Sequence, residues 1–185
     1  MSKIFLTADE LRLQSFQLAE MVYDSDYRPD MICGVWRGGA PVAIAVHEYF
    51  VWHGIEVDHI PIRTRSYYGV EQQNKEIKVD SLEYLLSRIK PNTKLLLVDD
   101  VFDTGRSIEA IISAVQSGSN IDADGIRVAC AWYKPGKNKT SITPDYFVRE
   151  TEDWIVFPHE LEGLPYDEIM AGKPEIAKTL KHPDD

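Results

Sequence analysis

Cysteine is scarce in this sequence, and basic residues are outnumbered by acidic ones. The 185 residues include 2 cysteines, Cys33 and Cys130, and both lie in apolar runs. This placement argues against a disulfide framework and predicts buried, reduced thiols. The 30 Asp and Glu residues against 20 Lys and Arg give a net charge of −10. Because sequence-independent binding to nucleic acid needs a basic surface, we expect no nucleic acid partner.

Long apolar segments are also missing. No apolar run is long enough to span a bilayer, and the N-terminal residues lack the apolar core of a signal peptide. We therefore expect a cytoplasmic protein with no membrane partner. A chain of 185 residues is long enough for one domain with a sizeable hydrophobic core.

Two common nucleotide-binding motifs are absent. The sequence contains neither the Gly-x-x-x-x-Gly-Lys-Ser/Thr string of a P-loop nor the Gly-x-Gly-x-x-Gly string of a dinucleotide-binding fold. A phosphatase with an Asp-x-Asp pair is a closer competitor, because Asp99, Asp100 and Asp103 stand near one another. However, the residues two positions after Asp99 and Asp100 are Val101 and Phe102, so this pattern fails as well.

Helix and strand patterns alternate along the chain. Periodicity and capping residues predict helices at about 7–23, from Pro41 to Gly54, at 81–89 and from the turn at 104–107 to about 117. They predict strands at 31–35, 57–63, 95–98 and 126–133. The polar segment 66–79 suits a loop or a frayed hairpin, and an irregular lobe follows residue 133. This alternation is typical of an α/β fold, with a parallel-sheet core flanked by helices on both faces.

The most informative segment joins the strand at 95–98 to the next helix. Asp99, Asp100 and Asp103 provide three carboxylates in a predicted turn, and Thr104-Gly-Arg-Ser107 provides two hydroxyls and a glycine at a helix start. Unpaired N–H groups at a helix N-terminus, beside a glycine that permits close approach, suit a phosphate monoester. Carboxylates next to such a site fit a ligand whose other end carries sugar hydroxyls, a metal or developing positive charge.

The string Val98-Asp-Asp-Val-Phe-Asp-Thr-Gly-Arg-Ser107 resembles the phosphoribosyl pyrophosphate (PRPP) binding motif of the type I phosphoribosyltransferases. The resemblance implies their fold, in a single domain 1–185 with a core at about 25–135 and a small C-terminal, base-binding hood at about 134–170. It implies that Asp99 and Asp100 face the ribose and the metal shell. The residues implied for binding the 5-phosphate are Asp103, Thr104, Gly105, Arg106 and Ser107.

Two further segments resemble parts of this family. Trp36, Arg37 and Gly38 match the position of its pyrophosphate loop, where a guanidinium and glycine N–H groups can hold an anion. The family sometimes has a non-proline cis peptide in this loop, which we expect near Trp36–Arg37. Ser66 and Tyr67 resemble the Ser-Tyr pair of a flexible catalytic loop that closes over the substrates and excludes water. Taken alone, each segment also suits an ordinary connection.

The C-terminal part resembles the hood of hypoxanthine, guanine and xanthine phosphoribosyltransferases. Lys134, at a strand end, stands where that family contacts a purine O6, and Trp154 and Ile155 stand where it stacks on the base. Glu160 is a weaker candidate for a second magnesium shell beside Asp100. Without the other motifs, Lys134 would suit a surface lysine and Trp154 a core aromatic residue.

The resemblance as a whole implies a purine salvage enzyme. It would transfer the 5-phosphoribosyl group from PRPP, held as a Mg²⁺ complex, to N9 of hypoxanthine, guanine or xanthine. Asp103 would be the catalytic residue, accepting or sharing the N7 proton of the base. A PRPP-binding regulatory protein and a phosphoribosyltransferase for a pyrimidine base remain alternatives. Since the family commonly forms dimers or tetramers, we expect a homodimer or homotetramer.

Overall fold

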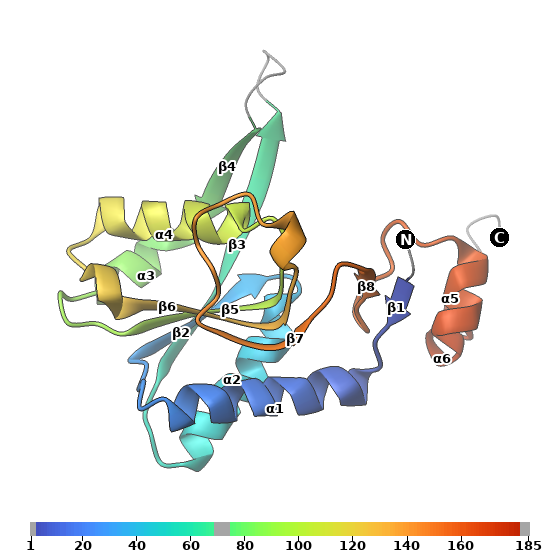
Figure 1. Cartoon of the computed structure of the whole chain (residues 1–185), viewed down its shortest axis with the longest axis horizontal. Coiled ribbons are helices and arrows are strands. Elements are labelled where there is room, and N and C mark those ends of the chain that lie inside the picture. Colours follow the sequence, from blue (N-terminus) through green and yellow to red (C-terminus); the bar gives the residue numbers. More distant parts are fainter. Residues whose placement is uncertain (1–2, 69–74, 182–185) are drawn as a thin grey trace. The chain divides into compact units, whose positions relative to one another are not determined.

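A computed structural model describes residues 3–68 and 75–181 of the chain (Figure 1). The chain divides into two compact units. The larger unit contains Arg12–Glu152, and the smaller unit contains Met1–Leu11 together with Asp153–Asp185. The sequence predicts a single domain 1–185 with a C-terminal hood at about 134–170, and this assignment stays a prediction. It does not predict that the N-terminal residues join the C-terminal ones in one unit.

The larger unit is built on a six-stranded sheet with the order β4-β3-β2-β5-β6-β7. Every neighbouring pair is parallel except β3 and β4, which confirms the expected parallel core. The strands are β2 (Met31–Trp36), β3 (Asp58–Tyr68), β4 (Lys75–Asp80), β5 (Leu95–Phe102), β6 (Ile126–Tyr133) and β7 (Tyr146–Glu150).

Helices lie on both faces of this sheet (Figure 1). One face carries α1 (Ala8–Asp24) and α2 (Gly39–Trp52), and the other carries α3 (Leu82–Arg88) and α4 (Arg106–Gly118). The strand β2 is buried on both sides from Met31 to Val35, as expected of a parallel strand between two helix layers. Gly34 lets α2 approach closely, since an added Cβ would lie 2.8 Å from the Cβ of Ala43.

The core on the α4 side of the sheet joins alternate residues of β2, β5 and β6 to the apolar stripe of α4. Its fully buried members include Cys33, Leu95, Leu97, Ile111, Val115 and Cys130. Both cysteines are therefore buried and unpaired, as predicted. Burial raises the pKa of the Cys33 thiol to about 12, so this thiol stays protonated at neutral pH.

The predicted end of the strand at residue 98 is wrong. The strand β5 continues to Phe102, because β6 pairs with it as far as Tyr133, the partner of Phe102. Asp99 and Asp100 therefore lie on a strand, and only Asp103 lies in the turn that follows. The apolar run that marks the strand in the sequence ends at Val98. The pairing with β6 that extends the strand to Phe102 is long-range, and the local pattern does not contain it.

Two polar or irregular segments of the sequence contribute strands to the main sheet. The segment 66–79 belongs to a hairpin of β3 and β4, which confirms the predicted hairpin alternative, and its connection at 69–74 lies outside the described residues. The strand β7 lies in the predicted irregular lobe and extends the main sheet by pairing with β6.

The smaller unit has its own parallel sheet of β1 (Lys3–Phe5) and β8 (Trp154–Val156). The helices α5 (Tyr166–Gly172) and α6 (Pro174–Ala177) follow, and Lys3 forms an ion pair with Glu168 of α5. The predicted capping box is confirmed: the N–H of Thr7 donates to Oε2 of Glu10 at 2.8 Å, and the N–H of Glu10 donates to Oγ1 of Thr7 at 3.2 Å.

Among the described residues, no helix has both the length and the apolarity needed to cross a bilayer.

Candidate active site

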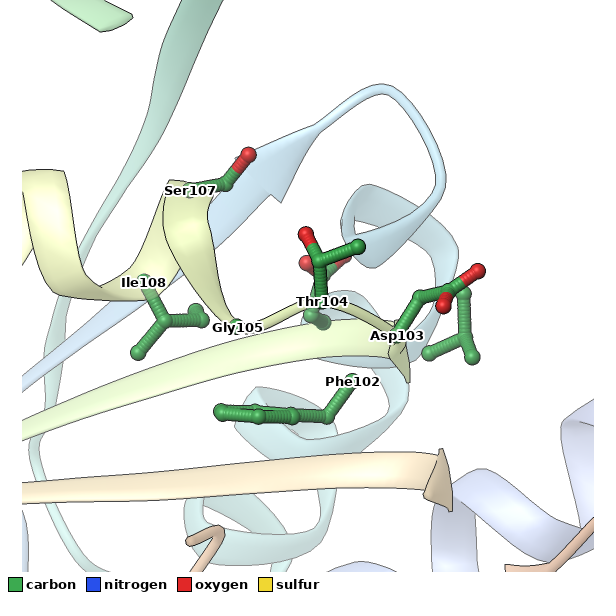
Figure 2. Close-up of a pocket in the computed structure, with 8 residues that line it drawn as sticks. Phe102, Asp103, Thr104, Gly105, Ser107 and Ile108 are labelled. Atoms are coloured by element: carbon green, nitrogen blue, oxygen red, sulfur yellow. The ribbon is translucent and has the colours of Figure 1, made fainter. Parts of the chain in front are cut away.

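The turn between β5 and α4 lines a pocket at the carboxyl end of the central strand (Figure 2). Figure 2 shows the hydroxyls of Thr104 and Ser107 on the same side of the turn, with Phe102 packed on the opposite side. The pocket is lined by Asp99, Val101, Phe102, Asp103, Thr104, Gly105, Ser107 and Ile108. Most of the residues predicted to bind the 5-phosphate are therefore neighbours, whereas the exposed Arg106 is not among the lining residues.

Gly105 is required by both backbone conformation and space. Its φ of +76° is in the left-handed region that favours glycine. An added Cβ would lie 2.7 Å from Cζ of Phe102 and 2.7 Å from Oγ1 of Thr140. Glycine at this position therefore lets Phe102 and Thr140 pack directly against the backbone of the turn.

A second loop, between β6 and β7, supports this turn from outside the motif. The N–H of Lys139 donates to the carbonyl of Thr104 at 3.0 Å. Oδ1 of Asn138 accepts from the N–H of Thr140 at 2.9 Å and from its Oγ1 at 3.0 Å, which fixes the loop. This support is not predicted from the sequence, although Asn-x-Thr is a recognisable turn signal.

The strand β3 also reaches the turn at 103–107, which we name the phosphate turn after its predicted ligand. Oγ1 of Thr64 donates to Oγ of Ser107 at 3.3 Å. Ser66 and Tyr67 follow on the same strand, in register with Ile77 and Glu76 of β4. Their predicted role as a closing loop stays a prediction, and residues 69–74 of that loop lie outside the described residues.

Asp99 and Asp100 form a crowded pair of carboxylates at the end of β5. The N–H of Asp100 donates to Oδ1 of Asp99 at 3.0 Å, and the N–H of Val101 donates to Oδ1 of Asp100 at 2.9 Å. Burial, and then the charge of Asp100, raise the pKa of Asp99 well above its ordinary value. A cation or a donor hydroxyl beside this pair would relieve that unfavourable charge.

The predicted pyrophosphate loop lies directly against these acids. The peptide bond between Trp36 and Arg37 is cis, as expected from the resemblance. A Cβ added to Gly38 would lie 1.9 Å from Oδ2 of Asp100, and one added to Gly39 would lie 2.5 Å from the carbonyl oxygen of Val98. The fold therefore joins two segments about sixty residues apart into one site.

Asp103 faces the end of β6. Its Oδ2 lies 3.5 Å from Nζ of Lys134, whose side chain is 8% exposed. Its Oδ1 is buried and, within the described part of the chain, has no hydrogen-bond partner. A carboxylate oxygen in this state fits a donor from a ligand, because buried polar atoms are nearly always paired.

The remaining predicted residues belong to the smaller unit. Trp154 is 44% exposed on β8, whereas Ile155 is buried. Oε2 of Glu160 accepts from the N–H of Phe157 at 3.4 Å, within its own turn. The contribution of these three residues to a site with Lys134 stays a prediction.

The carboxylates of Asp99 and Asp100 fit a magnesium ion that enters the site bound to a substrate of the protein. In the described ranges, no group of three or more His, Cys, Asp or Glu side chains could hold a metal ion alone. Asp99 and Asp100 offer two carboxylates instead. Since Mg²⁺ usually takes one or two protein carboxylates together with substrate phosphates and water, this donor set suits a Mg²⁺–PRPP complex.

Comparison with known proteins agrees with this geometry. A model of the phosphoribosyl transferase domain matches residues 10–165. The chain belongs to the type I phosphoribosyltransferases. The purine phosphoribosyltransferase from Pyrococcus horikoshii OT3 is 31% identical, with a TM-score of 0.70 over 89% of this chain and 99% of that chain. The similarity between this phosphoribosyltransferase and the Pyrococcus protein thus extends over most of both chains.

More distant structures share the phosphoribosyltransferase fold. A hypothetical protein from Neisseria gonorrhoeae, solved with bound ppGpp, has a TM-score of 0.74 and 19% identity over 96% of this chain and 97% of that chain. The xanthine-guanine-hypoxanthine phosphoribosyltransferase from Helicobacter pylori has a TM-score of 0.60 and 19% identity, covering 84% and 92%. A search of curated protein sequences gives no match.

Proposed function

We propose that this phosphoribosyltransferase transfers the 5-phosphoribosyl group from PRPP to N9 of a 6-oxopurine, namely hypoxanthine, guanine or xanthine. The observation that carries the proposal is the pair of Asp103 and Lys134, 3.5 Å apart, beside the phosphate turn. An unpartnered carboxylate oxygen and a buried ammonium offer one acceptor and one donor to a base. A 6-oxopurine matches both, through its N7 proton and its O6.

The reaction forms the bond from N9 to C1 of the ribose and breaks the bond from C1 to the pyrophosphate oxygen. Positive charge develops on the ribose as the pyrophosphate leaves. Asp99 and Asp100 would stabilise this charge, because carboxylates in a buried site interact strongly with a developing cation. Asp103 would accept or share the N7 proton as N9 attacks.

The substrate phosphates would be held at two places. Thr104, Gly105 and Ser107 would bind the 5-phosphate through hydroxyls and backbone N–H groups at the start of α4. Arg37 and Gly38 would bind the departing pyrophosphate. Mg²⁺ bound near Asp100 would neutralise charge on the pyrophosphate group, and Glu160 is a further candidate for its outer shell.

The choice of base would depend on Lys134 and the hood. Nζ of Lys134 would donate to O6, whereas the 6-amino group of adenine offers a donor there and would be disfavoured. Trp154 would stack on the ring beside Ile155. The similarity to the Pyrococcus enzyme supports a purine over orotate or uracil.

An absorbance assay with PRPP tests the proposal. We expect nucleotide formation from hypoxanthine, guanine or xanthine that is lost when Mg²⁺ is chelated. Turnover of orotate or uracil alone would overturn the purine assignment. Binding of PRPP without turnover of any base would instead favour a PRPP-binding regulatory protein. Sedimentation of the same sample would test the expected homodimer or homotetramer.

A further inference from the structure

Lys173 connects α5 to α6 and turns its side chain into the smaller unit. The residue is only 8% exposed. Its Nζ donates to three backbone carbonyl oxygens: that of Phe157, that of Pro158 at 3.2 Å and that of Glu160 at 2.5 Å. The ammonium therefore has as many acceptors as it has N–H groups.

A buried lysine of this kind needs a physical reason, because removal of an ammonium from water is unfavourable. Burial lowers the pKa of Lys173, and the nearby charge of Glu160 offsets part of this effect. Lys173 lies between two short helices and is buried, so it adds little polar surface to the protein. Its evident contribution is to the segment whose carbonyls it binds.

That segment is a tight turn directly after β8. The N–H of Glu160 donates to the carbonyl of Phe157 at 3.0 Å, which closes the turn. Three carbonyl dipoles that converge on one point repel one another, and a cation at that point removes the repulsion. The turn at residues 157–160 is therefore held by three hydrogen bonds from a single ammonium group.

We propose that Lys173 is a positioning residue for base binding, which acts by fixing the turn at 157–160 and thereby the edge of the hood next to Trp154 and Ile155. Lys173 would not touch the substrate. The part of this inference that concerns the base rests on the proposed function. The part that concerns the turn rests on the three hydrogen bonds alone.

The test replaces the ammonium with an apolar chain of similar length. In Lys173→Met the three carbonyls lose their donor, whereas Lys178→Met removes an exposed lysine of the same region that pairs with Glu175 at 2.8 Å. We expect the KM for the base to rise about tenfold or more in Lys173→Met, while the Kd for PRPP measured without base stays within about twofold. Lys178→Met should change neither quantity.

Hydrogen exchange of the full chain separates this inference from the proposed function. Amides of residues 154–160 should exchange faster in Lys173→Met, and those of 104–107 should not. Unchanged exchange at 154–160, an unchanged KM for the base, or an equal rise in the PRPP Kd would overturn the inference. If the wild type turns over no base, the proposed function fails, and the exchange data still decide whether Lys173 fixes the turn.

A second variant covers the case in which Lys173→Met does not fold. Lys173→Arg keeps the charge but replaces a point-like ammonium with a planar fork, which cannot donate to three convergent carbonyls in the same way. We expect a raised KM for the base and an unchanged Kd for PRPP. Equal changes in both would show that Lys173 supports the whole fold instead.

Discussion

Gly38 and Asp100 are in such close contact that a Cβ on Gly38 would lie 1.9 Å from Oδ2 of the carboxylate. The backbone of Gly38, with φ of −64° and ψ of −34°, is one that any residue adopts. Space, and not conformation, therefore requires glycine at this position. The contact ties the loop after β2 to the acids at the end of β5.

Gly38→Ala should weaken PRPP binding. The new methyl group must displace Asp100, which is 8% exposed and has little room to move. We expect the Kd for PRPP to rise by about tenfold or more, which corresponds to about 1.4 kcal/mol. Titration calorimetry in the presence of Mg²⁺ measures it.

Gly118→Ala is the matched control for crowding. Its Cβ would lie 2.8 Å from Cδ1 of Leu86, outside the pocket and against a flexible side chain. We expect a loss of stability of about 1–3 kcal/mol at most, with PRPP binding unchanged. Equal weakening of PRPP binding in both variants would contradict a specific role for the contact between Gly38 and Asp100.

Gly105→Ala tests the phosphate turn, with Gly54→Ala as control. The two glycines have nearly the same φ, +76° and +74°, but a Cβ at Gly54 has nothing within 4 Å. Gly54→Ala should therefore lower the free energy of unfolding by only about 1–2 kcal/mol, the cost of a left-handed backbone for a residue with a Cβ. Gly105→Ala should also lose PRPP binding, because Phe102 and Thr140 block the methyl group. Thermal unfolding and PRPP titration of both variants separate the two effects.

Asp103→Asn should lower the rate of the chemical step far more than it lowers PRPP affinity. The amide has nearly the same shape as the carboxylate, but it cannot accept the N7 proton. We expect kcat to fall by a factor on the order of 10²–10⁴. Steady-state kinetics and PRPP binding should be measured on the same preparation. Equal losses of rate and affinity would indicate that Asp103 only organises the turn.

Asp99→Asn should change how stability depends on pH. The raised pKa means that folded Asp99 binds its proton at a pH where the unfolded chain has released it. Its contribution to stability is therefore present at low pH and lost as the pH rises through the folded pKa. Relative to the wild type, Asp99→Asn should gain stability with rising pH, by at most about 1.4 kcal/mol per pH unit.

Asp80→Asn is the control, because the pKa of Asp80 is shifted in the opposite direction from that of Asp99. A hydrogen bond from Arg65 lowers the pKa of Asp80, so its contribution is present above the ordinary carboxyl pKa and lost as the pH falls. Relative to the wild type, this variant should lose stability as the pH rises. Urea unfolding across the pH range, without PRPP or Mg²⁺, measures both. Parallel curves for Asp99→Asn and the wild type would contradict the raised pKa.

The sequence predicts those parts of the site whose signal is local. The segment from Val98 to Ser107 carries its strand, acids, glycine and helix start in adjacent positions, so its place in the fold follows from its own pattern. The cis peptide between Trp36 and Arg37 follows from the resemblance to the family, whereas pyrophosphate binding by this loop stays a prediction. Lys134 directly follows β6, which ends at Tyr133 as predicted, because an apolar run marks this strand clearly.

The parts that the sequence does not predict depend on distant partners. The extension of β5 past Val98 requires β6, and the support of Thr104 requires the N–H of Lys139. The strand β1 has three residues, which is too short for a period to be detected. Lys173 looks like a surface residue in the sequence, since three backbone carbonyls leave no trace in the pattern of side chains.

The pairing of β1 with β8 has a consequence for how the protein is made. Lys3 lies opposite Trp154, so β1 leaves the ribosome long before its partner strand is synthesised. The larger unit ends at Glu152, so all strands of the main sheet are synthesised before β8, the partner of β1. Because domains fold as their residues emerge, the phosphate turn should form before the smaller unit does. The newborn chain would then be able to hold a phosphate before it can select a base.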